Sequence, residues 1–249
     1  MATKKERQRQ LARDAYARRQ VRQAQRVRRT RRLWATAIAV VLVLGAGTGV
    51  AAAAGTFTPS KPFTCTYTRS GTAARKVSLP PTQVDLSATY TAKIITNRGT
   101  IAIDLNNSKA ACTVNSFASL ADQGFYNNTP CPRLDTTGIY ILQCGDPTGT
   151  GSGGPGYEFG SENLKGAKYL AGTLAMANSG TADSNGSQFF LVYKNTPELP
   201  ASYTPFGTVT SGLNVLKAIA AKGDNNSNPA GGGKPNEKVQ IERVTISKT

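Results

Sequence analysis

The chain has 249 residues, with 30 Lys and Arg against 14 Asp and Glu, so its net charge is +16, and it contains no histidine. The absence of histidine excludes Ser-His-Asp and Cys-His nucleophile systems and zinc sites with His ligands. The charge is unevenly distributed, because residues 1–33 hold 13 Lys and Arg against two acidic residues and carry +11 of the total. The length permits one large domain or two small domains.

An uncharged apolar run of 21 residues, Trp34 to Ala54, follows the basic segment directly. A helix of that length extends about 31 Å, close to the thickness of the hydrocarbon core of a bilayer. We therefore interpret residues 34–54 as a single transmembrane helix in contact with the lipid bilayer. Because basic flanks stay on the cytoplasmic side, residues 1–33 are predicted to form a cytoplasmic arm, and the C-terminal part is predicted to be extracytoplasmic.

Other interpretations of this N-terminal region stay open. A cleaved signal peptide would also combine basic and apolar residues, with small residues at 51–54, and Arg28-Arg29 resembles part of a twin-arginine signal. The basic arm of 33 residues is, however, longer than an ordinary signal peptide. Basic arms also bind nucleic acid or anionic lipids. We expect no nucleic-acid binding, because an arm that sets membrane topology accounts for the charge.

Residues 55–88 are rich in Thr, Ser, Pro, Lys and Gly, a composition typical of a spacer between membrane and domain. A strand pattern begins after this segment. Apolar and polar residues alternate around residues 92–94 and again over 101–105, and the turn sequence Asn97-Arg98-Gly99 lies between the two runs. These two runs predict a β-hairpin at the start of a domain that covers residues 89–249.

Two helices are predicted further along this domain. The first is capped by Thr113, ends near Gly124 and carries an apolar face formed by Val114, Phe117, Leu120 and Ala121. The second covers residues 211–221 and ends at Gly223. The other segments are short strands and Gly-rich turns. Two isolated helices among many strands predict a mainly β domain, built as a closed antiparallel barrel with helices at its ends.

All four cysteines follow the apolar run, and none belongs to a CxxC pair. In an exported domain such cysteines favour disulfide bonds over metal ligation, so no metal site is predicted. Strand-like segments on either side would place Cys131 and Cys144 opposite each other across a hairpin. Of the three possible pairings we therefore favour Cys131–Cys144, which leaves Cys65 with Cys112.

Two stretches carry the functional signal. The first, residues 131–159, contains Arg133, the sequence Tyr-Ile-Leu-Gln-Cys-Gly-Asp at 140–146 and a Gly-rich loop at 149–156. This loop lacks the Gly-Lys-Ser/Thr ending of a phosphate-binding loop and leads into no helical pattern, so nucleotide binding is not predicted. The second, residues 172–190, joins Met-Ala-Asn to Asn-Gly-Ser-Gln-Phe-Phe. Taken alone it would be a β-connection that turns at Asn185-Gly186.

Together and in this order, these motifs resemble the cyclophilin family of peptidyl-prolyl cis-trans isomerases, over about residues 91–247. The resemblance implies a closed eight-stranded barrel with two capping helices, a proline pocket on its outer face and no cofactor. The basic arm, single span and spacer are similar to membrane-anchored bacterial cyclophilins. The resemblance and the predicted location together predict an isomerase that assists the folding of exported, proline-containing polypeptides.

The resemblance also assigns roles to individual residues. Arg133 matches the catalytic arginine, and Phe190 matches the floor of the pocket. Tyr140 stands where Phe is usual, Tyr203 replaces a histidine, and Glu198 replaces the Trp of the drug-sensitive members. The full set of predicted substrate-binding residues is Tyr140, Ile141, Gln143, Ala177, Asn178, Gln188, Phe190, Leu199 and Tyr203.

These residue types suit the chemistry on physical grounds. Amide resonance gives an Xaa-Pro bond a rotational barrier of about 18–20 kcal/mol, and a catalyst only has to bind the twisted amide more tightly than the planar forms. The proline nitrogen gains a lone pair as conjugation is lost. Arg133 can donate a hydrogen bond to that nitrogen without changing its own protonation state, so activity is predicted to be flat across neutral pH.

The alternative function is a binding module that holds proline-containing segments of envelope proteins without efficient turnover. Pro132 stands where a histidine is frequent in the family, and the segment from 134 to 139 is about two residues longer than in the short members. Both features would tilt Arg133. Exchange spectroscopy on a proline peptide separates catalysis from binding.

Overall fold

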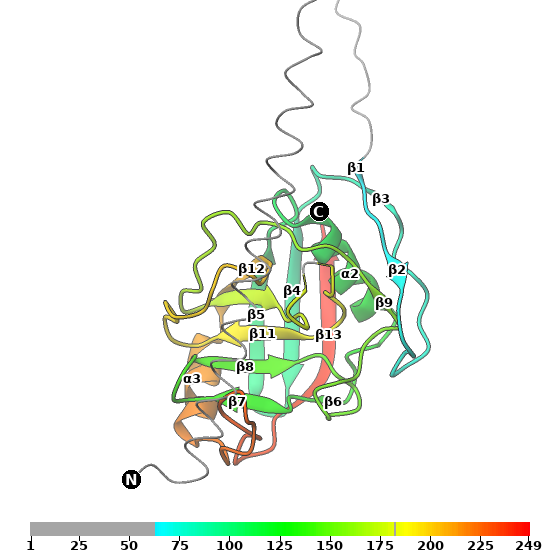
Figure 1. Ribbon diagram of the computed structural model, residues 1–249. Helices are drawn as coiled ribbons and strands as arrows, with labels where there is room; N and C mark the ends of the chain where they lie inside the picture. Colours follow the sequence, from blue (N-terminus) through cyan, green and yellow to red (C-terminus); the bar gives the residue numbers. More distant parts are fainter. Residues whose placement is uncertain (1–62, 182) are drawn as a thin grey trace, which may run out of the picture. The chain divides into compact units, whose positions relative to one another are not determined.

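A computed structural model describes residues 63–181 and 183–249 of the chain (Figure 1). The predicted cytoplasmic arm and membrane span, residues 1–33 and 34–54, lie outside these residues. Within the described ranges, no helix is both long enough and apolar enough to cross a membrane. The described residues belong to a unit that begins at Ser60 and ends at Thr249.

Nine strands form one antiparallel sheet, in the order β6-β13-β4-β5-β12-β10-β11-β8-β7. The predicted hairpin is confirmed as the pair β4 and β5, in which Ile94 lies opposite Ile101. The strands of this sheet are β4 (Tyr90–Thr96), β5 (Gly99–Leu105), β6 (Thr129–Pro130), β7 (Arg133–Asp135), β8 (Ile141–Cys144), β10 (Thr173–Met176), β11 (Phe189–Val192), β12 (Pro205–Ser211) and β13 (Gln240–Lys248).

The mainly β class is confirmed, but the closed eight-stranded barrel is wrong. The sheet is curled, with β8 and β11 running across the direction of β4 and β13 (Figure 1). Its hydrogen-bonded order begins at β6 and ends at β7, and within the described residues no strand pair joins these two ends. Both end strands are short, and Pro130 and Pro132 have no N–H to donate to a ladder. The chain itself links the two edges, through Cys131 and Pro132.

The two predicted helices are present as α2 (Ala111–Asp122) and α3 (Leu213–Ala221). Helix α2 packs against β13, and α3 packs against β5. The apolar face predicted for the first helix is buried, with Phe117 and Leu120 fully enclosed in the main core. Gly124 follows the end of α2 with φ +69°, the left-handed conformation expected after a helix.

The N-terminus of α2 differs from the prediction. Thr113 lies inside the helix. The N-cap position is occupied by Ala110, whose side chain makes no capping hydrogen bond. The carboxylate of Glu162 takes this role from a distant loop, because it accepts hydrogen bonds from the backbone N–H of Cys112 at 3.1 Å and of Thr113 at 2.8 Å. Local capping signals in the sequence cannot reveal a capping residue that lies 49 residues away.

Residues 63–88, here called the N-terminal strap, pack onto the domain. Strand β1 (Phe63–Thr64) pairs with β3 (Gln83–Val84), and β2 (Thr68–Arg69) pairs with β9 (Tyr157–Glu158). The Tyr67 side chain is buried, and its hydroxyl donates to the carbonyl of Cys112 at 2.8 Å. The compact unit therefore begins before residue 89, and the strap is not a free spacer.

Both predicted disulfide pairings are confirmed. Cys65–Cys112 ties the strap to α2, and its Cα atoms are 5.4 Å apart. Cys131–Cys144 joins the segment before β7 to the end of β8. The second bond crosslinks the edge of the sheet that carries Arg133.

Candidate functional site

A cavity of about 300 Å³ opens beside β7, β8 and β11, and it gathers eight of the ten residues predicted for the site. The lining consists of an apolar group, a polar group and a few residues that were not predicted to bind substrate. The lining residues are Pro132, Arg133, Ile139, Ile141, Gln143, Thr150, Gly151, Ala177, Asn178, Phe190, Leu199, Tyr203 and Asn228.

The apolar half of the cavity is a small hydrophobic cluster separate from the main core. Strand β11 is buried on both faces: Phe189 and Leu191 belong to the main core, and Phe190 faces the cluster. Phe190 is 3% exposed, and its ring meets the Tyr203 ring edge-on, with 5.5 Å between centroids. Ile141, Leu199 and Ile139 complete a socket of the size and polarity that suit a small apolar ring.

Tyr140 does not line the cavity, contrary to prediction. Side chains alternate along β8 and the residues before it, so Ile139, Ile141 and Gln143 face the cavity, whereas Tyr140 packs against the main core. The Tyr140 ring lies 6.0 Å from that of Tyr193, with the Lys194 ammonium 4.3 Å above it. Ile139 takes the place predicted for the tyrosine.

The polar half is built on Arg133 and Gln143, which are opposite each other on β7 and β8. Nη1 of Arg133 donates to Oε1 of Gln143 at 3.4 Å. The amide of Gln143 then donates to Oε1 of Gln188 at 2.9 Å. A fork-shaped cation therefore stands beside the apolar socket, held by a line of amides.

Gln188 does not line this first cavity, but it lines the adjoining hollow that is described below. Its amide nitrogen donates to the carbonyls of Gly151 and Gly153, both at 3.0 Å. These bonds hold the Gly-rich loop (residues 149–156), which supplies Thr150 and Gly151 to the cavity wall. Gln188 acts on the site through Gln143 and this loop.

The Gly-rich loop is also fixed at its base by Asp146. The carboxylate accepts hydrogen bonds from the backbone N–H of Thr148 at 2.8 Å and of Gly151 at 2.7 Å. Burial by itself raises the pKa of the Asp146 carboxyl, but the hydrogen bonds from Thr148, Gly153 and Gly151 outweigh burial and lower that pKa below its usual value. The loop is therefore held by a carboxylate that is ionised at neutral pH.

A second hollow of about 480 Å³ continues from the first. The two share Gln143, Gly151, Ala177 and Asn178, and residues 70–72 of the N-terminal strap form part of the far wall. The Asn178 amide donates to the carbonyl of Ser202 at 2.9 Å, which fixes the shared rim. The continuous groove has room for the residues that flank a ring bound in the first cavity.

Sequence reasoning missed Ile139, Asn228 and Asp135 at this site. The alternation that excludes Tyr140 would have selected Ile139. Asn228 comes from the loop after α3 and reaches the cavity over a long sequence separation, for which no local signal exists. Asp135 is fully buried beside Arg133 and makes an ion pair with it at 3.3 Å.

A family model described as cyclophilin type peptidyl-prolyl cis-trans isomerase/CLD matches residues 91–246, more than half of the chain. The chain belongs to the cyclophilin family. The matched residues contain both helices and, apart from Tyr90 at the start of β4 and residues 247–248 at the end of β13, all nine strands of the main sheet. The N-terminal strap lies before the matched residues.

The curated relatives include cyclophilins of mycobacteria. The chain is 45% identical over 201 residues to a probable peptidyl-prolyl cis-trans isomerase B of Mycobacterium leprae, covering 73% of this chain and 66% of the relative. It is 44% identical over 188 residues to the probable peptidyl-prolyl cis-trans isomerase B of Mycobacterium tuberculosis, covering 69% of this chain and 57% of the relative. The chain thus spans less than two thirds of the length of these relatives.

A crystal structure of a Cryptosporidium parvum cyclophilin type isomerase is 33% identical and has a TM-score of 0.58, covering 64% of this chain and 98% of that one. A second structure of that protein, described as in the presence of the dipeptide Ala-Pro, gives 33% identity and a TM-score of 0.57. Both support the cyclophilin fold of this chain.

Proposed function

We propose that the chain catalyses cis-trans isomerisation of Xaa-Pro peptide bonds. One observation carries the proposal: a single cavity holds the apolar socket over Phe190 and the guanidinium of Arg133 beside it. The socket has the shape and polarity to take a pyrrolidine ring. The arginine stands where the nitrogen of that ring would need a donor.

Catalysis in such a site needs no covalent intermediate. As the amide twists, the proline nitrogen loses conjugation and becomes a better hydrogen-bond acceptor, so a donor aimed at it stabilises the twisted state more than either planar state. Each 1.36 kcal/mol removed from the barrier of about 18–20 kcal/mol accelerates the rotation tenfold. A fixed guanidinium suits this role because its charge does not depend on pH near neutrality.

The groove beyond the socket supports a polypeptide as the substrate. Rotation about the Xaa-Pro bond requires that one side of the bond stays fixed while the other side turns. Gln143 and the rim at Ala177 and Asn178 separate the socket from the second hollow. The ring is held in the socket, and the flanking residues turn across this rim.

We further propose that the substrates are exported polypeptides and that residues 34–54 anchor the protein as a single span with the N-terminus in the cytoplasm. The basic arm followed by an uncharged apolar run supports this orientation. Two disulfides and no free cysteine among the described residues fit an oxidising compartment. Xaa-Pro isomerisation is slow enough to limit folding, which gives such an enzyme a task there.

Exchange spectroscopy on the full-length chain tests the proposed activity. A proline-containing tetrapeptide is mixed with a small molar fraction of the protein, and the cis-trans exchange rate and the peptide affinity are measured together. We expect exchange far above the uncatalysed rate. Binding with an unchanged exchange rate would leave only a binding module, and absence of both would reject the function.

A further inference from the structure

The carboxylate of Asp135 lies beside the proposed catalytic group but outside the substrate cavity. Asp135 follows Arg133 by two residues on β7, so both side chains are on the same face of the strand. It is 1% exposed. A buried carboxylate is costly unless it is paired and hydrogen-bonded, so its partners indicate what it does.

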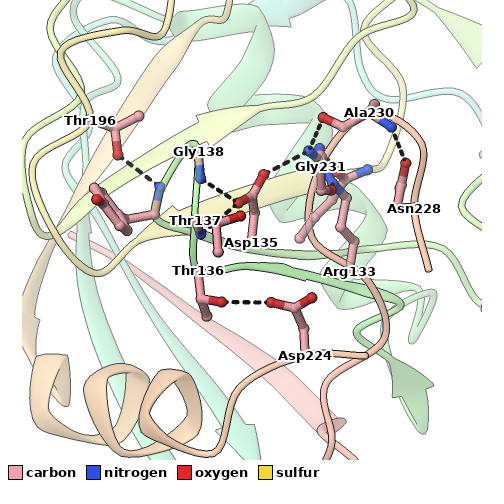
Figure 2. Close-up of polar contacts among 12 residues, drawn as sticks. Arg133, Asp135, Thr136, Thr137, Gly138, Thr196, Asp224, Asn228, Ala230 and Gly231 are labelled. Carbon is pink, nitrogen blue, oxygen red and sulfur yellow. Dashed lines mark hydrogen bonds and ion pairs between the residues drawn. The ribbon is translucent and has the colours of Figure 1, made fainter. Parts of the chain in front are cut away.

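The two oxygens of this carboxylate have separate partners (Figure 2). Oδ1 accepts hydrogen bonds from the backbone N–H of Thr137 at 3.1 Å and of Gly138 at 3.0 Å, which closes the turn after β7. Oδ2 accepts from Nη2 of Arg133 at 3.3 Å. One oxygen shapes the turn, and the other holds the guanidinium.

The loop after α3 completes a cradle around the same guanidinium. The carbonyl of Gly231 accepts from Nε at 3.0 Å, and the carbonyl of Ala230 accepts from Nη2 at 3.3 Å. Gly231 has φ +104°, and a Cβ there would lie 2.7 Å from Oδ2 of Asp135. A glycine is therefore required for the loop to approach both the arginine and the carboxylate.

The remaining donors show what the cradle leaves available. A guanidinium has five N–H groups. Bonds to Gly231, Ala230, Asp135 and Gln143 use four of them within the described part of the chain, one on Nε, two on Nη2 and one on Nη1. Among the described residues one N–H of Nη1 is left, on the same nitrogen that bonds Gln143, and both Arg133 and Gln143 line the cavity.

We propose that Asp135 is the positioning residue of Arg133: it fixes the guanidinium so that the last Nη1 N–H is presented to the twisted Xaa-Pro bond. This inference rests on the proposed function. The carboxylate touches no substrate. It acts by removing the rotational freedom of the arginine, which a donor aimed at a transition state must lose in advance.

Asp135→Asn in the full-length chain separates the two tasks of the carboxylate. The amide oxygen can keep the bonds to Thr137 and Gly138, while the amide nitrogen in place of Oδ2 is a donor facing a donor. We expect kcat, from exchange spectroscopy, to fall about 10- to 100-fold. The peptide Kd should stay within about twofold, because the apolar socket is untouched.

Asp224→Asn is the matched control. It removes a carboxylate from the same region, where Asp224 accepts from the Thr136 hydroxyl at 2.7 Å without touching Arg133 (Figure 2). Its kcat should equal that of the unaltered chain. In NMR spectra of arginine-labelled protein, the Nε–H signal of Arg133 is assigned by its loss in Arg133→Ala. This signal should broaden or shift in Asp135→Asn and should be unchanged in Asp224→Asn.

Gly231→Ala keeps the inference testable if Asp135→Asn does not fold. It displaces the cradle from the loop side, and Gly166→Ala imposes similar strain at φ +69° where a Cβ meets nothing within 4 Å. We expect kcat to fall in Gly231→Ala and to stay unchanged in Gly166→Ala. A wild-type kcat in Asp135→Asn would overturn the inference. If Asp135→Asn does not fold, a wild-type kcat in Gly231→Ala would overturn it. Loss of peptide affinity in step with kcat would also overturn it.

Failure of the proposed function would give a different result from failure of the positioning role. If Arg133→Ala retains full turnover, the catalytic role of the arginine falls, and the positioning role falls with it. If Arg133→Ala is inactive while Asp135→Asn is fully active, only the positioning role falls.

Discussion

Arg133 and Gln143 lie opposite each other on the paired strands β7 and β8, and Nη1 of the arginine donates to the glutamine side chain at 3.4 Å. The disulfide Cys131–Cys144 crosslinks the same two segments, two residues before the arginine and one residue after the glutamine. The polar half of the site is therefore a braced unit at the edge of the sheet, where β7 is the last strand.

Removing this brace should affect both stability and turnover. The double variant Cys131→Ala, Cys144→Ala opens a loop of 13 residues, so we expect the free energy of unfolding in urea to fall by about 3 kcal/mol. Turnover per folded molecule should fall as well, because β7 loses its crosslink beside Arg133. The double variant Cys65→Ala, Cys112→Ala should lose stability but keep kcat. Equal kcat in both double variants would contradict a role of the first disulfide in the site.

The alternation along the approach to β8 predicts different effects for two neighbouring residues. Ile139→Ala removes part of the apolar socket, and we expect the peptide Kd to rise about fivefold, equivalent to about 1 kcal/mol of lost apolar burial. Tyr140→Ala removes packing against Tyr193 and should lower the melting temperature without weakening peptide binding. Titration of both variants with the same peptide checks this. The reverse order of affinities would show that Tyr140 lines the site in solution.

Activity should not depend on pH near neutrality. The chain has no histidine, and the proposed donor is an arginine, which stays protonated. We expect kcat/KM from exchange spectroscopy to stay constant within about twofold between roughly pH 6 and 9. A bell-shaped profile with a midpoint inside that window would indicate a titrating catalytic group and contradict the mechanism.

The Gly-rich loop should make the domain sensitive to acid. Hydrogen bonds from Thr148, Gly153 and Gly151 outweigh burial and lower the pKa of Asp146 in the folded protein. The stability that Asp146 contributes is therefore present above its unfolded pKa of about 3.9 and is lost as pH falls through the lower folded pKa. Asp146→Asn should flatten the dependence of unfolding free energy on pH between about 5 and 2. Asp122→Asn, at an exposed position, should leave it unchanged.

Local patterns in the sequence predicted the elements that depend on neighbouring residues. The hairpin of β4 and β5 followed from the alternation of apolar residues, and α2 followed from its apolar face and Gly124. The resemblance to cyclophilins supplied eight lining residues of the cavity. The disulfide pairing across β7 and β8 followed from strand-like segments on either side of the two cysteines.

The features that were missed depend on long-range contacts. Glu162 caps α2 from a separate loop, and Gly231 reaches Arg133 across 98 residues. The sheet has open ends because its end strands, β6 and β7, are short. The composition of the sequence does not reveal the length of these strands. The strap has the composition of a spacer, yet one disulfide and one buried tyrosine hold it on the domain.

The proposed catalytic role of Arg133 is tested most directly by the turnover of Arg133→Ala, compared with that of Arg243→Ala, which changes an exposed arginine on β13. Exchange spectroscopy gives kcat and peptide Kd for both variants of the full-length chain. We predict that kcat falls about 100-fold or more in Arg133→Ala, with the fold and the peptide affinity retained, and that Arg243→Ala matches the unaltered chain. Undiminished kcat in Arg133→Ala would contradict the catalytic role of this arginine.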